Sequence, residues 1–316
     1  MMTVAHDFPF DPSNGYTLEM LLQIAPGNEV DGFAEFWQNN YQQVMEAPLR
    51  YKVEAEVWSS VDSDKTYRIK FENYDGQSIT MWIARPENSC GGLLQGQGYS
   101  NPGAPCVSEF GLTTAYACVR GLGFSQCKNI PWMPHKHVLH GIDCKENYIL
   151  RGVIADQWMA ARVLLDMFPD TEENLCYTGG SMGGGMGALL LAWDKRFRAA
   201  YLNIPTFGSE VRFDHQSTGS GEACRMYVLE HPEALEVLRW FDASAAAKYI
   251  SIPTACAPAQ FDPCVAPVGQ FSIANALSDK IKTLFIREVG HFAPTLHDKK
   301  LNEDILQWCR KNFTVE

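Results

Sequence analysis

The spacing of hydrophobic positions in the first third of the chain indicates a sheet that begins antiparallel. Residues 51–58 alternate between apolar and polar side chains, which is typical of a half-buried strand. Two further strands are predicted over 66–71 and 78–84, because the run Asn73–Gly76 between them carries the turn signal of a hairpin. The sheet is therefore expected to start with antiparallel strands.

Upstream of these strands, residues 1–48 are expected to form an N-terminal segment that wraps the outside of the domain and ends in a helix. The helix is predicted from Asp31 onward, because large apolar residues recur at helical spacing at Phe33, Trp37, Tyr41 and Val44. Pro48 is expected to end it, since proline cannot continue a helix.

After residue 86, short apolar runs alternate with amphipathic segments, which is the pattern of βαβ units and a parallel sheet. Strands are predicted over 92–95, 113–119, 174–178, 198–204, 252–261 and 282–286, and helices over 147–168, after 181, near 268–277 and over 299–312. We therefore expect a single α/β domain over residues 1–316, with helices on both faces of a mostly parallel sheet. Residues 207–241 interrupt the alternation, and this lid-like insertion is expected to cover a site at the strand ends.

Composition and charge exclude several classes of partner. The net charge of −11 argues against binding to nucleic acid or to an anionic membrane, because both need a basic surface. No run approaches the roughly 18 apolar residues of a membrane span. The first residues lack a basic region followed by an apolar stretch, and the ten cysteines form no C-x-x-C pair. These features predict a reduced, cytoplasmic protein without a signal peptide.

The strongest chemical signal is Gly179-Gly180-Ser181-Met182-Gly183, which lies between a predicted strand and a predicted helix. In that context G-x-S-x-G forms a nucleophile elbow, a tight turn that exposes a serine hydroxyl at the top of an α/β-hydrolase sheet. Glycines two residues before and after Ser181 let the helix start press against the strand end. The alternative is a glycine-rich turn with a solvated serine.

A serine nucleophile needs a base and an acid that orients the base. Asp262 follows the predicted strand 252–261, and His291 follows the next strand, so Ser181, Asp262 and His291 occur in the chain order of an α/β-hydrolase triad. Singly, either residue is equally consistent with a capping aspartate or a loop histidine. The backbone amides of Tyr99, after a buried strand, and of Met182, at the helix start, are the candidate oxyanion hole.

Other polar and aromatic residues receive structural interpretations. His135, His137 and His140 lack a carboxylate or cysteine at ligand spacing, so a surface loop is expected there rather than a metal site, and no cofactor or metal is implied. Arg120 is expected to pair with one of the charged residues around the helix 147–168, namely Asp143, Arg151 or Asp156. Trp132 and Tyr148 are candidates for pocket lining or for core.

Together, three motifs resemble the acetyl xylan esterase and cephalosporin C deacetylase family. They are Arg120-Gly121-Leu122-Gly123, Gly180-Ser181-Met182-Gly183-Gly184-Gly185 and Gly290-His291. The resemblance extends from about Asp31 to the C-terminus. Three positions depart from the family pattern: Leu122 and Met182 replace glutamines, and Phe292 replaces a glutamate. The departures affect substrate choice and oligomer geometry more than acyl-transfer chemistry.

The resemblance implies an α/β-hydrolase that removes acetyl groups from esters of sugars or related small molecules, including acetylated oligosaccharides. It implies Ser181, Asp262 and His291 as the triad, the amides of Tyr99 and Met182 as the oxyanion hole, and a homo-oligomer, often a hexameric ring. A carboxylesterase or peptidase with another acyl preference and a non-catalytic ligand-binding relative are the alternative hypotheses.

Overall fold

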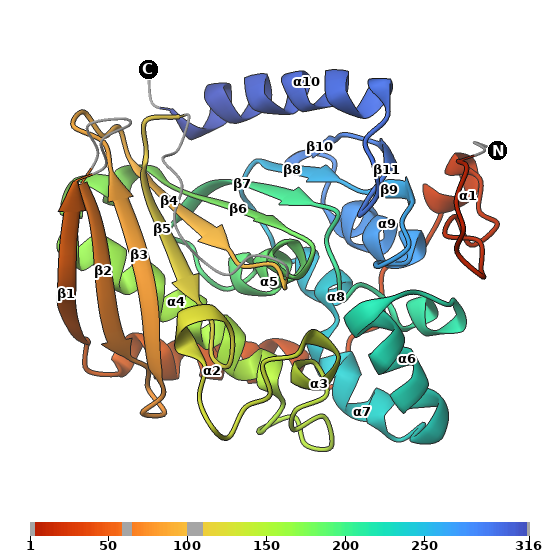
Figure 1. Cartoon of the computed structure of the whole chain (residues 1–316), viewed down its shortest axis with the longest axis horizontal. Coiled ribbons are helices and arrows are strands. Elements are labelled where there is room, and N and C mark those ends of the chain that lie inside the picture. The colour runs from red at the N-terminus through yellow and green to blue at the C-terminus, as the bar shows by residue number, and fades with distance from the viewer. Residues whose placement is uncertain (1–3, 59–64, 100–109, 315–316) are drawn as a thin grey trace.

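The computed structural model describes residues 4–58, 65–99 and 110–314, and a nine-stranded sheet forms its centre (Figure 1). The spatial order is β1-β2-β3-β5-β4-β6-β7-β8-β10. The strands are β1 (Arg50–Trp58), β2 (Lys65–Glu72), β3 (Ser78–Arg85), β4 (Gly92–Gly96), β5 (Thr113–Cys118), β6 (Leu175–Gly180), β7 (Phe197–Asn203), β8 (Thr254–Ala257) and β10 (Lys282–Leu284).

The predicted antiparallel start and parallel continuation of the sheet are both confirmed. The pairs β1–β2, β2–β3 and β3–β5 are antiparallel, whereas β4 pairs in parallel with β5 and β6. The remaining pairs, β6–β7, β7–β8 and β8–β10, are also parallel. The architecture is that of an α/β-hydrolase.

Helices cover both faces of the sheet, as expected. They are α1 (Leu18–Leu21), α2 (Phe33–Glu46), α3 (Pro134–His137), α4 (Ile149–Met167), α5 (Met182–Leu191), α6 (Gly219–Glu230), α7 (Ala234–Leu238), α8 (Ala243–Ala247), α9 (Pro267–Ala276) and α10 (Leu296–Phe313). Short 3₁₀ helices are η1 (Gly123–Ser125), η2 (Pro169–Asn174), η3 (Glu210–Asp214) and η4 (Arg239–Phe241).

Consecutive strand residues supply the two layers of the core, because side chains alternate between the faces of a sheet. Leu93 and Cys176 belong to a small cluster with Ile305 and Phe313 of α10. The residues next to them, Leu94 and Tyr177, belong to the large cluster on the opposite face, which α2, α4 and α5 build. In Figure 1, α10 accordingly lies on the other side of the sheet from α4 and α5.

Two predicted strands are wrong as single elements. The stretch 252–261 divides into β8 and β9 (Ala259–Phe261), and 282–286 gives only β10, followed by β11 (Arg287–Val289). Pro258 separates β8 from β9, and its missing N–H interrupts the ladder. The strands β9 and β11 leave the main sheet and form a two-stranded parallel sheet of their own.

The insertion 207–241 forms η3, α6, α7 and η4. In Figure 1, α6 and α7 project from the sheet beside α3, and α6 is in contact with α3. At the other end of the chain, the N-terminal segment packs on α9, where Leu21 is buried, and Gly27 N donates to Ser244 Oγ of α8 at 2.8 Å. Within the described residues, no helix is both long and apolar enough to cross a membrane.

Candidate active site

Ser181 occupies a strained turn between β6 and α5. Its backbone has φ 56° and ψ −120°, a region that a residue with a Cβ rarely adopts. The turn is fixed by hydrogen bonds, because Ser181 N donates to Asn203 O at 3.0 Å and Ser181 O accepts from Gly185 N and Thr206 N at 3.1 and 3.2 Å. The sequence prediction of a strand, a tight turn and a helix is confirmed.

Glycine is required on both sides of the serine for the reason expected from the sequence. A Cβ on Gly179 would lie 2.5 Å from Gly183 O, and a Cβ on Gly183 would lie 2.5 Å from Gly96 O of β4. By contrast, the nearest atom to a Cβ on Gly180 would be 3.6 Å away, which is ordinary contact. The backbones of β4, β6 and α5 therefore meet without side chains between them.

The three side chains predicted to act together form one hydrogen-bonded chain. Ser181 Oγ lies 3.0 Å from His291 Nε2, and His291 Nδ1 lies 2.8 and 3.0 Å from Oδ2 and Oδ1 of Asp262. A carboxylate only accepts, so Nδ1–H donates to Asp262 and leaves Nε2 as an acceptor for the serine hydroxyl. This tautomer is the one that general-base activation of a serine requires.

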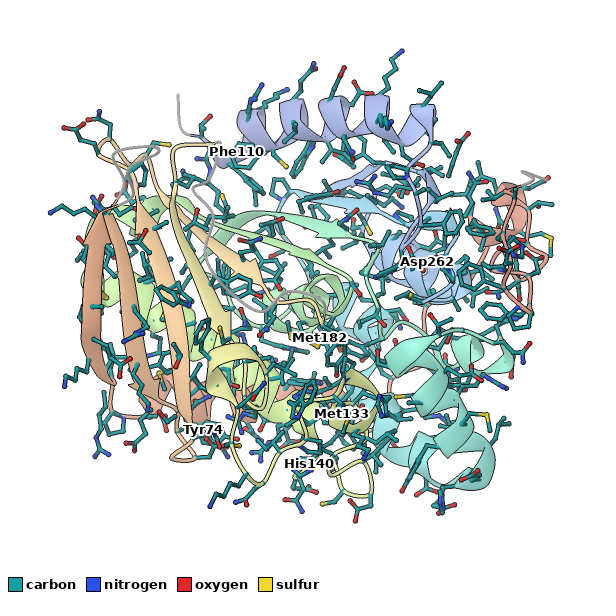
Figure 2. All side chains as sticks on the ribbon, viewed as in Figure 1. Tyr74, Phe110, Met133, His140, Met182 and Asp262 are labelled. Atoms are coloured by element: carbon teal, nitrogen blue, oxygen red, sulfur yellow. The ribbon has the colours of Figure 1, made fainter. Side chains whose placement is uncertain are left out.

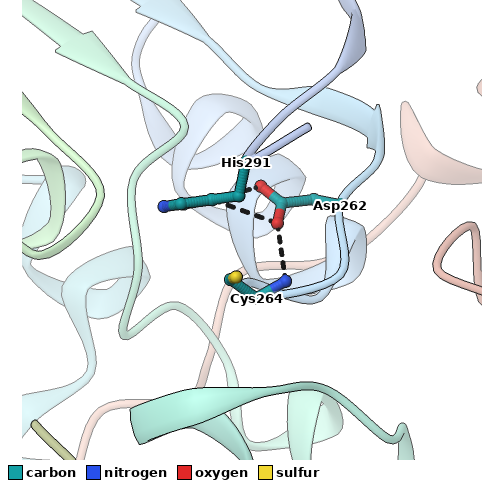
Figure 3. A group of neighbouring side chains, drawn as sticks. All are labelled: Asp262, Cys264 and His291. Carbon is teal, nitrogen blue, oxygen red and sulfur yellow. Dashed lines mark hydrogen bonds and ion pairs between the residues drawn. The ribbon is translucent and has the colours of Figure 1, made fainter. Parts of the chain in front are cut away.

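The carboxylate of Asp262 is buried and fully engaged (Figure 3). Oδ1 accepts from the amides of Cys264 and Val265 at 2.8 and 3.0 Å, and Oδ2 accepts from Gln270 Nε2 at 2.9 Å. Gln270 is itself buried, and its Oε1 accepts from Ala259 N of β9 at 2.8 Å. Sequence reasoning missed Gln270, because no motif marks a glutamine on α9.

The small sheet β9–β11 brings Asp262 and His291 together. Phe261 pairs with Val289, so the residues that follow the two strands emerge side by side. Gly290 N donates to Phe261 O at 2.8 Å, and a Cβ on Gly290 would clash with the Asp262 carboxylate. His291 follows with φ 26°, which turns its imidazole toward both partners.

The surroundings of His291 stabilise its protonated form more than water stabilises the protonated form of a free histidine. Burial alone would lower the pKa, but the hydrogen bond to Asp262 and the charge of that carboxylate outweigh it and raise the pKa above 6.5. The imidazole keeps one exposed edge, with 24% of the side chain accessible. The contact with Asp262 therefore stabilises the protonated imidazole, while Nε2 of the neutral ring faces the Ser181 hydroxyl.

Ser181 and His291 border a cavity of about 250 Å³, which Tyr99 and Met182 also line. Figure 2 labels Met182 near the centre of the molecule, with Asp262 beyond it toward α9. Met182 is the first residue of α5, so its amide has no partner within the helix. Thr218, Gly219 and Ser220, at the start of α6 in the insertion, also line this cavity.

A second, smaller cavity adjoins the first and shares Thr206, Ser220, Cys264 and Val265 with its lining. Its volume of about 30 Å³ is enough for one or two water molecules. Tyr148 lines this inner cavity and is also buried in the core, whereas Trp132 is 59% exposed and lies in neither lining.

One group of side chains has the composition of a metal site. Asp262, Cys264 and His291 place possible ligand atoms within 4.8 Å of one another (Figure 3). A metal ion there would have to displace the hydrogen bond between His291 and Asp262, and burial raises the pKa of the Cys264 thiol, which disfavours the thiolate that binds metal. The contacts therefore fit a histidine–carboxylate pair better than a metal centre.

The expected pairing of Arg120 is confirmed with Asp156 of α4. The two side chains are joined at 2.8 and 3.0 Å, and Arg120 Nη1 also reaches Asp75 Oδ2 at 2.6 Å. The expectation of a surface loop for all three histidines is wrong for His137. It lies on α3, is fully buried, and contacts Tyr99 Oη and Arg120 O.

Comparison with known proteins identifies the family. The model described as acetyl xylan esterase (AXE1) matches residues 17–311, nearly the whole chain. The chain belongs to the acetyl xylan esterase family. The resemblance seen in the sequence motifs is thereby confirmed, and the protein is a carboxylic ester hydrolase.

Solved structures agree with this family at the level of the fold. Acetyl xylan esterase 1 from Thermoanaerobacterium sp. superposes with a TM-score of 0.80 at 18% identity, covering 95% of this chain and 99% of that one. An acetyl xylan esterase from Paenibacillus sp. gives 0.78 at 19% identity, covering 94% and 100%. A puromycin-hydrolyzing peptidase of Mycobacterium tuberculosis gives 0.61 at 15% identity, covering 83% of this chain and 41% of its own.

Proposed function

We propose that this acetyl xylan esterase family member is a serine esterase that hydrolyses short-chain acyl esters, chiefly acetyl esters, of sugars or related small molecules. The observation that carries the proposal is the continuous hydrogen-bonded chain from Ser181 through His291 to buried Asp262, which opens into a cavity. Unlike a single serine in a turn, this arrangement provides a nucleophile, a base and an orienting acid in contact.

In the proposed reaction, Ser181 Oγ attacks the ester carbonyl carbon while His291 Nε2 takes the hydroxyl proton. The amides of Met182 and Tyr99 donate to the oxyanion of the tetrahedral intermediate. His291 then returns the proton to the departing alcohol, which leaves an acyl group on Ser181. Water attacks that acyl-enzyme with His291 again as the base, so a carboxylic acid is released and the serine is restored.

Cavity size favours a short acyl group. The cavity at Ser181 has about 250 Å³, which is below the range of about 300–1,000 Å³ common for ligand pockets. The adjoining inner cavity measures about 30 Å³, which is room for one or two water molecules or a similarly small apolar group. A long acyl chain would have to displace buried side chains such as Phe207 and Phe241, which line that inner cavity.

The test is the initial rate of hydrolysis of p-nitrophenyl esters from acetyl to octanoyl. Fast acetate turnover that falls with chain length, and that disappears in Ser181→Ala, supports the proposal. Ser78→Ala, at the exposed start of β3, is the matched control and should retain the wild-type rate. A maximum at longer chains would assign a general carboxylesterase, and undiminished turnover in Ser181→Ala would overturn the nucleophile assignment.

The oligomer and location complete the proposal. The family resemblance supports a homo-oligomer, a hexameric ring in particular, which sedimentation velocity measures directly. No disulfide joins any two of the nine cysteines that the structure describes, which supports a reducing compartment such as the cytoplasm.

A further inference from the structure

His137 connects the active-site cavity to a buried charge network. Its Nε2 lies 2.9 Å from the carbonyl oxygen of Arg120, and its Nδ1 lies 3.0 Å from the hydroxyl of Tyr99. A carbonyl only accepts, so Nε2 carries the proton, and Nδ1 must then accept from the Tyr99 hydroxyl. The histidine therefore uses both nitrogens to fix Tyr99 to the chain at Arg120.

This connection persists over a wide pH range. Burial lowers the pKa of His137 to about 4, and burial raises the pKa of Tyr99 well above its usual value. Both rings are therefore neutral through the range in which esters are assayed, and the hydrogen bond keeps one direction. The rings also meet edge to face, with centroids 5.5 Å apart at an interplanar angle of 80°.

The far end of the connection is rigid. The Arg120 guanidinium is held by Asp156 and Asp75, and Arg120 N donates to Asp156 Oδ2 at 2.9 Å. Gly121 has φ 80°, and a Cβ there would clash with Ile130 Cγ2 and lie 3.1 Å from His137 Cδ2, so glycine leaves the space that these two side chains occupy. The carbonyl that accepts from His137 is thus fixed on both sides.

The near end lies at the proposed oxyanion hole. Tyr99 lines the cavity with Ser181 and Met182, and a Cβ on the preceding Gly98 would lie 3.5 Å from Gly180 O in the nucleophile turn. The side chain of Tyr99 meets His137 twice, through its hydroxyl and through its aromatic ring. Figure 2 labels Met133 and His140, which bracket α3 below Met182.

We propose that His137 is a positioning residue that anchors the ring of Tyr99 and thereby holds the Tyr99 amide toward the oxyanion. This inference rests on the proposed function, which assigns that amide to the oxyanion hole. Because the oxyanion is absent from the bound ester and develops only in the transition state and the tetrahedral intermediate, a displaced donor lowers kcat and leaves KM nearly unchanged. Complete loss of one such donor costs about 10²–10³ in kcat, so partial displacement should cost about 10–100-fold.

The experiment compares Tyr99→Phe, His137→Phe and the double variant with wild type on p-nitrophenyl acetate. Each single variant should lower kcat about 10–100-fold with KM within about twofold, and the double variant should be no slower than the slower single one. His137→Gln, whose amide has both an acceptor and a donor, should recover part of the loss. His135→Phe, exposed on the same helix, is the control and should retain wild-type kcat.

Each remaining outcome is decisive. Unchanged kcat in Tyr99→Phe, or losses that multiply in the double variant, would overturn the inference. If His137 contributed only to the stability of the fold, His137→Phe and His137→Gln would lower the unfolding midpoint equally, and glutamine would not recover kcat. If His137→Phe does not fold, Tyr99→Phe still decides, because it removes a single oxygen. Wild-type protein without activity on p-nitrophenyl acetate would contradict the proposed function and not the role of His137, so the wild-type rate is measured first.

Discussion

The carboxylate of Asp262 lies against the α-carbon of Gly290, with no room for a methyl group between them. This close approach comes from two parallel strands, because Gly290 N donates to Phe261 O at 2.8 Å, one residue before Asp262. His291 then follows directly and places Nδ1 within 3.0 Å of both carboxylate oxygens. Glycine before the histidine is therefore a geometric condition for the pair.

Gly290→Ala should reduce kcat/KM by at least about 100-fold, since an inserted methyl displaces the carboxylate from His291 and a misplacement of about 1 Å can cost 10²-fold. The unfolding midpoint should fall as well, because the displaced carboxylate is buried and gives up part of its hydrogen bonds to Cys264, Val265 and Gln270. Activity and thermal unfolding measured on the same preparation check this. Glu288→Ala, two residues earlier on β11, is the control, and equal activity of the two variants would contradict the prediction.

The pH dependence of the rate should report the raised pKa of His291. A protonated imidazole cannot accept the serine proton, so kcat/KM should increase with pH through an inflection above 6.5. Asp262→Asn removes the carboxylate that raises the pKa of His291, so the inflection should move to lower pH, and kcat should be lower by about 10⁴-fold. A pH–rate profile with its wild-type inflection at or below 6.5 would contradict this.

The raised pKa of His291 also affects the stability of the fold, with a pH dependence opposite to that of the activity. A pKa that is higher in the folded state stabilises the fold fully below pH 6.5, and this contribution disappears as the pH rises through the raised pKa. The enzyme should therefore lose this part of its folding free energy over the pH range in which it gains activity. Unfolding in urea at several pH values, for wild type and Asp262→Asn, measures the difference.

The buried pair of Arg120 and Asp156 should matter far more to stability than an exposed pair. Arg120→Met leaves the Asp156 carboxylate uncompensated in the core, where the side chain has no accessible surface, and should cost about 3–5 kcal/mol of unfolding free energy. Arg50→Met breaks a pair whose members are 66% and 49% exposed and should cost about 0–1 kcal/mol. Urea unfolding of both variants decides, and equal costs would contradict the prediction.

The glycines of the turn at Ser181 should differ in their tolerance of a side chain. Gly179→Ala and Gly183→Ala each place a Cβ 2.5 Å from a backbone oxygen and should destabilise the fold by about 1–3 kcal/mol. Gly180→Ala, with its nearest contact at 3.6 Å, should stay within about 0.5 kcal/mol. Unfolding midpoints of the three variants form the test, and comparable losses in all three would contradict it.

Much of the fold was predictable because its signals are local. Alternating polarity gave the antiparallel strands, helical spacing gave α2 and α4, and the turn at Ser181 carries its glycines within five residues. The chain order of Ser181, Asp262 and His291 also follows from strand order, since the carboxyl ends of parallel strands share one edge of the sheet. Local features were misread at Pro258, which divides a predicted strand into β8 and β9, at the predicted strand 282–286, of which only β10 forms, and at His137, which lies on α3.

The sequence by itself determined the order of most strands and helices, the serine turn and the candidates for the site. Only the tertiary structure decided how Asp262 and His291 meet, that Gln270 holds the carboxylate, and that His137 is buried against Tyr99. These contacts join residues far apart in the chain, and Tyr99 and His137 are separated by 38 positions. No periodicity or propensity encodes such a contact, because it exists only after the packed layers have brought distant segments together.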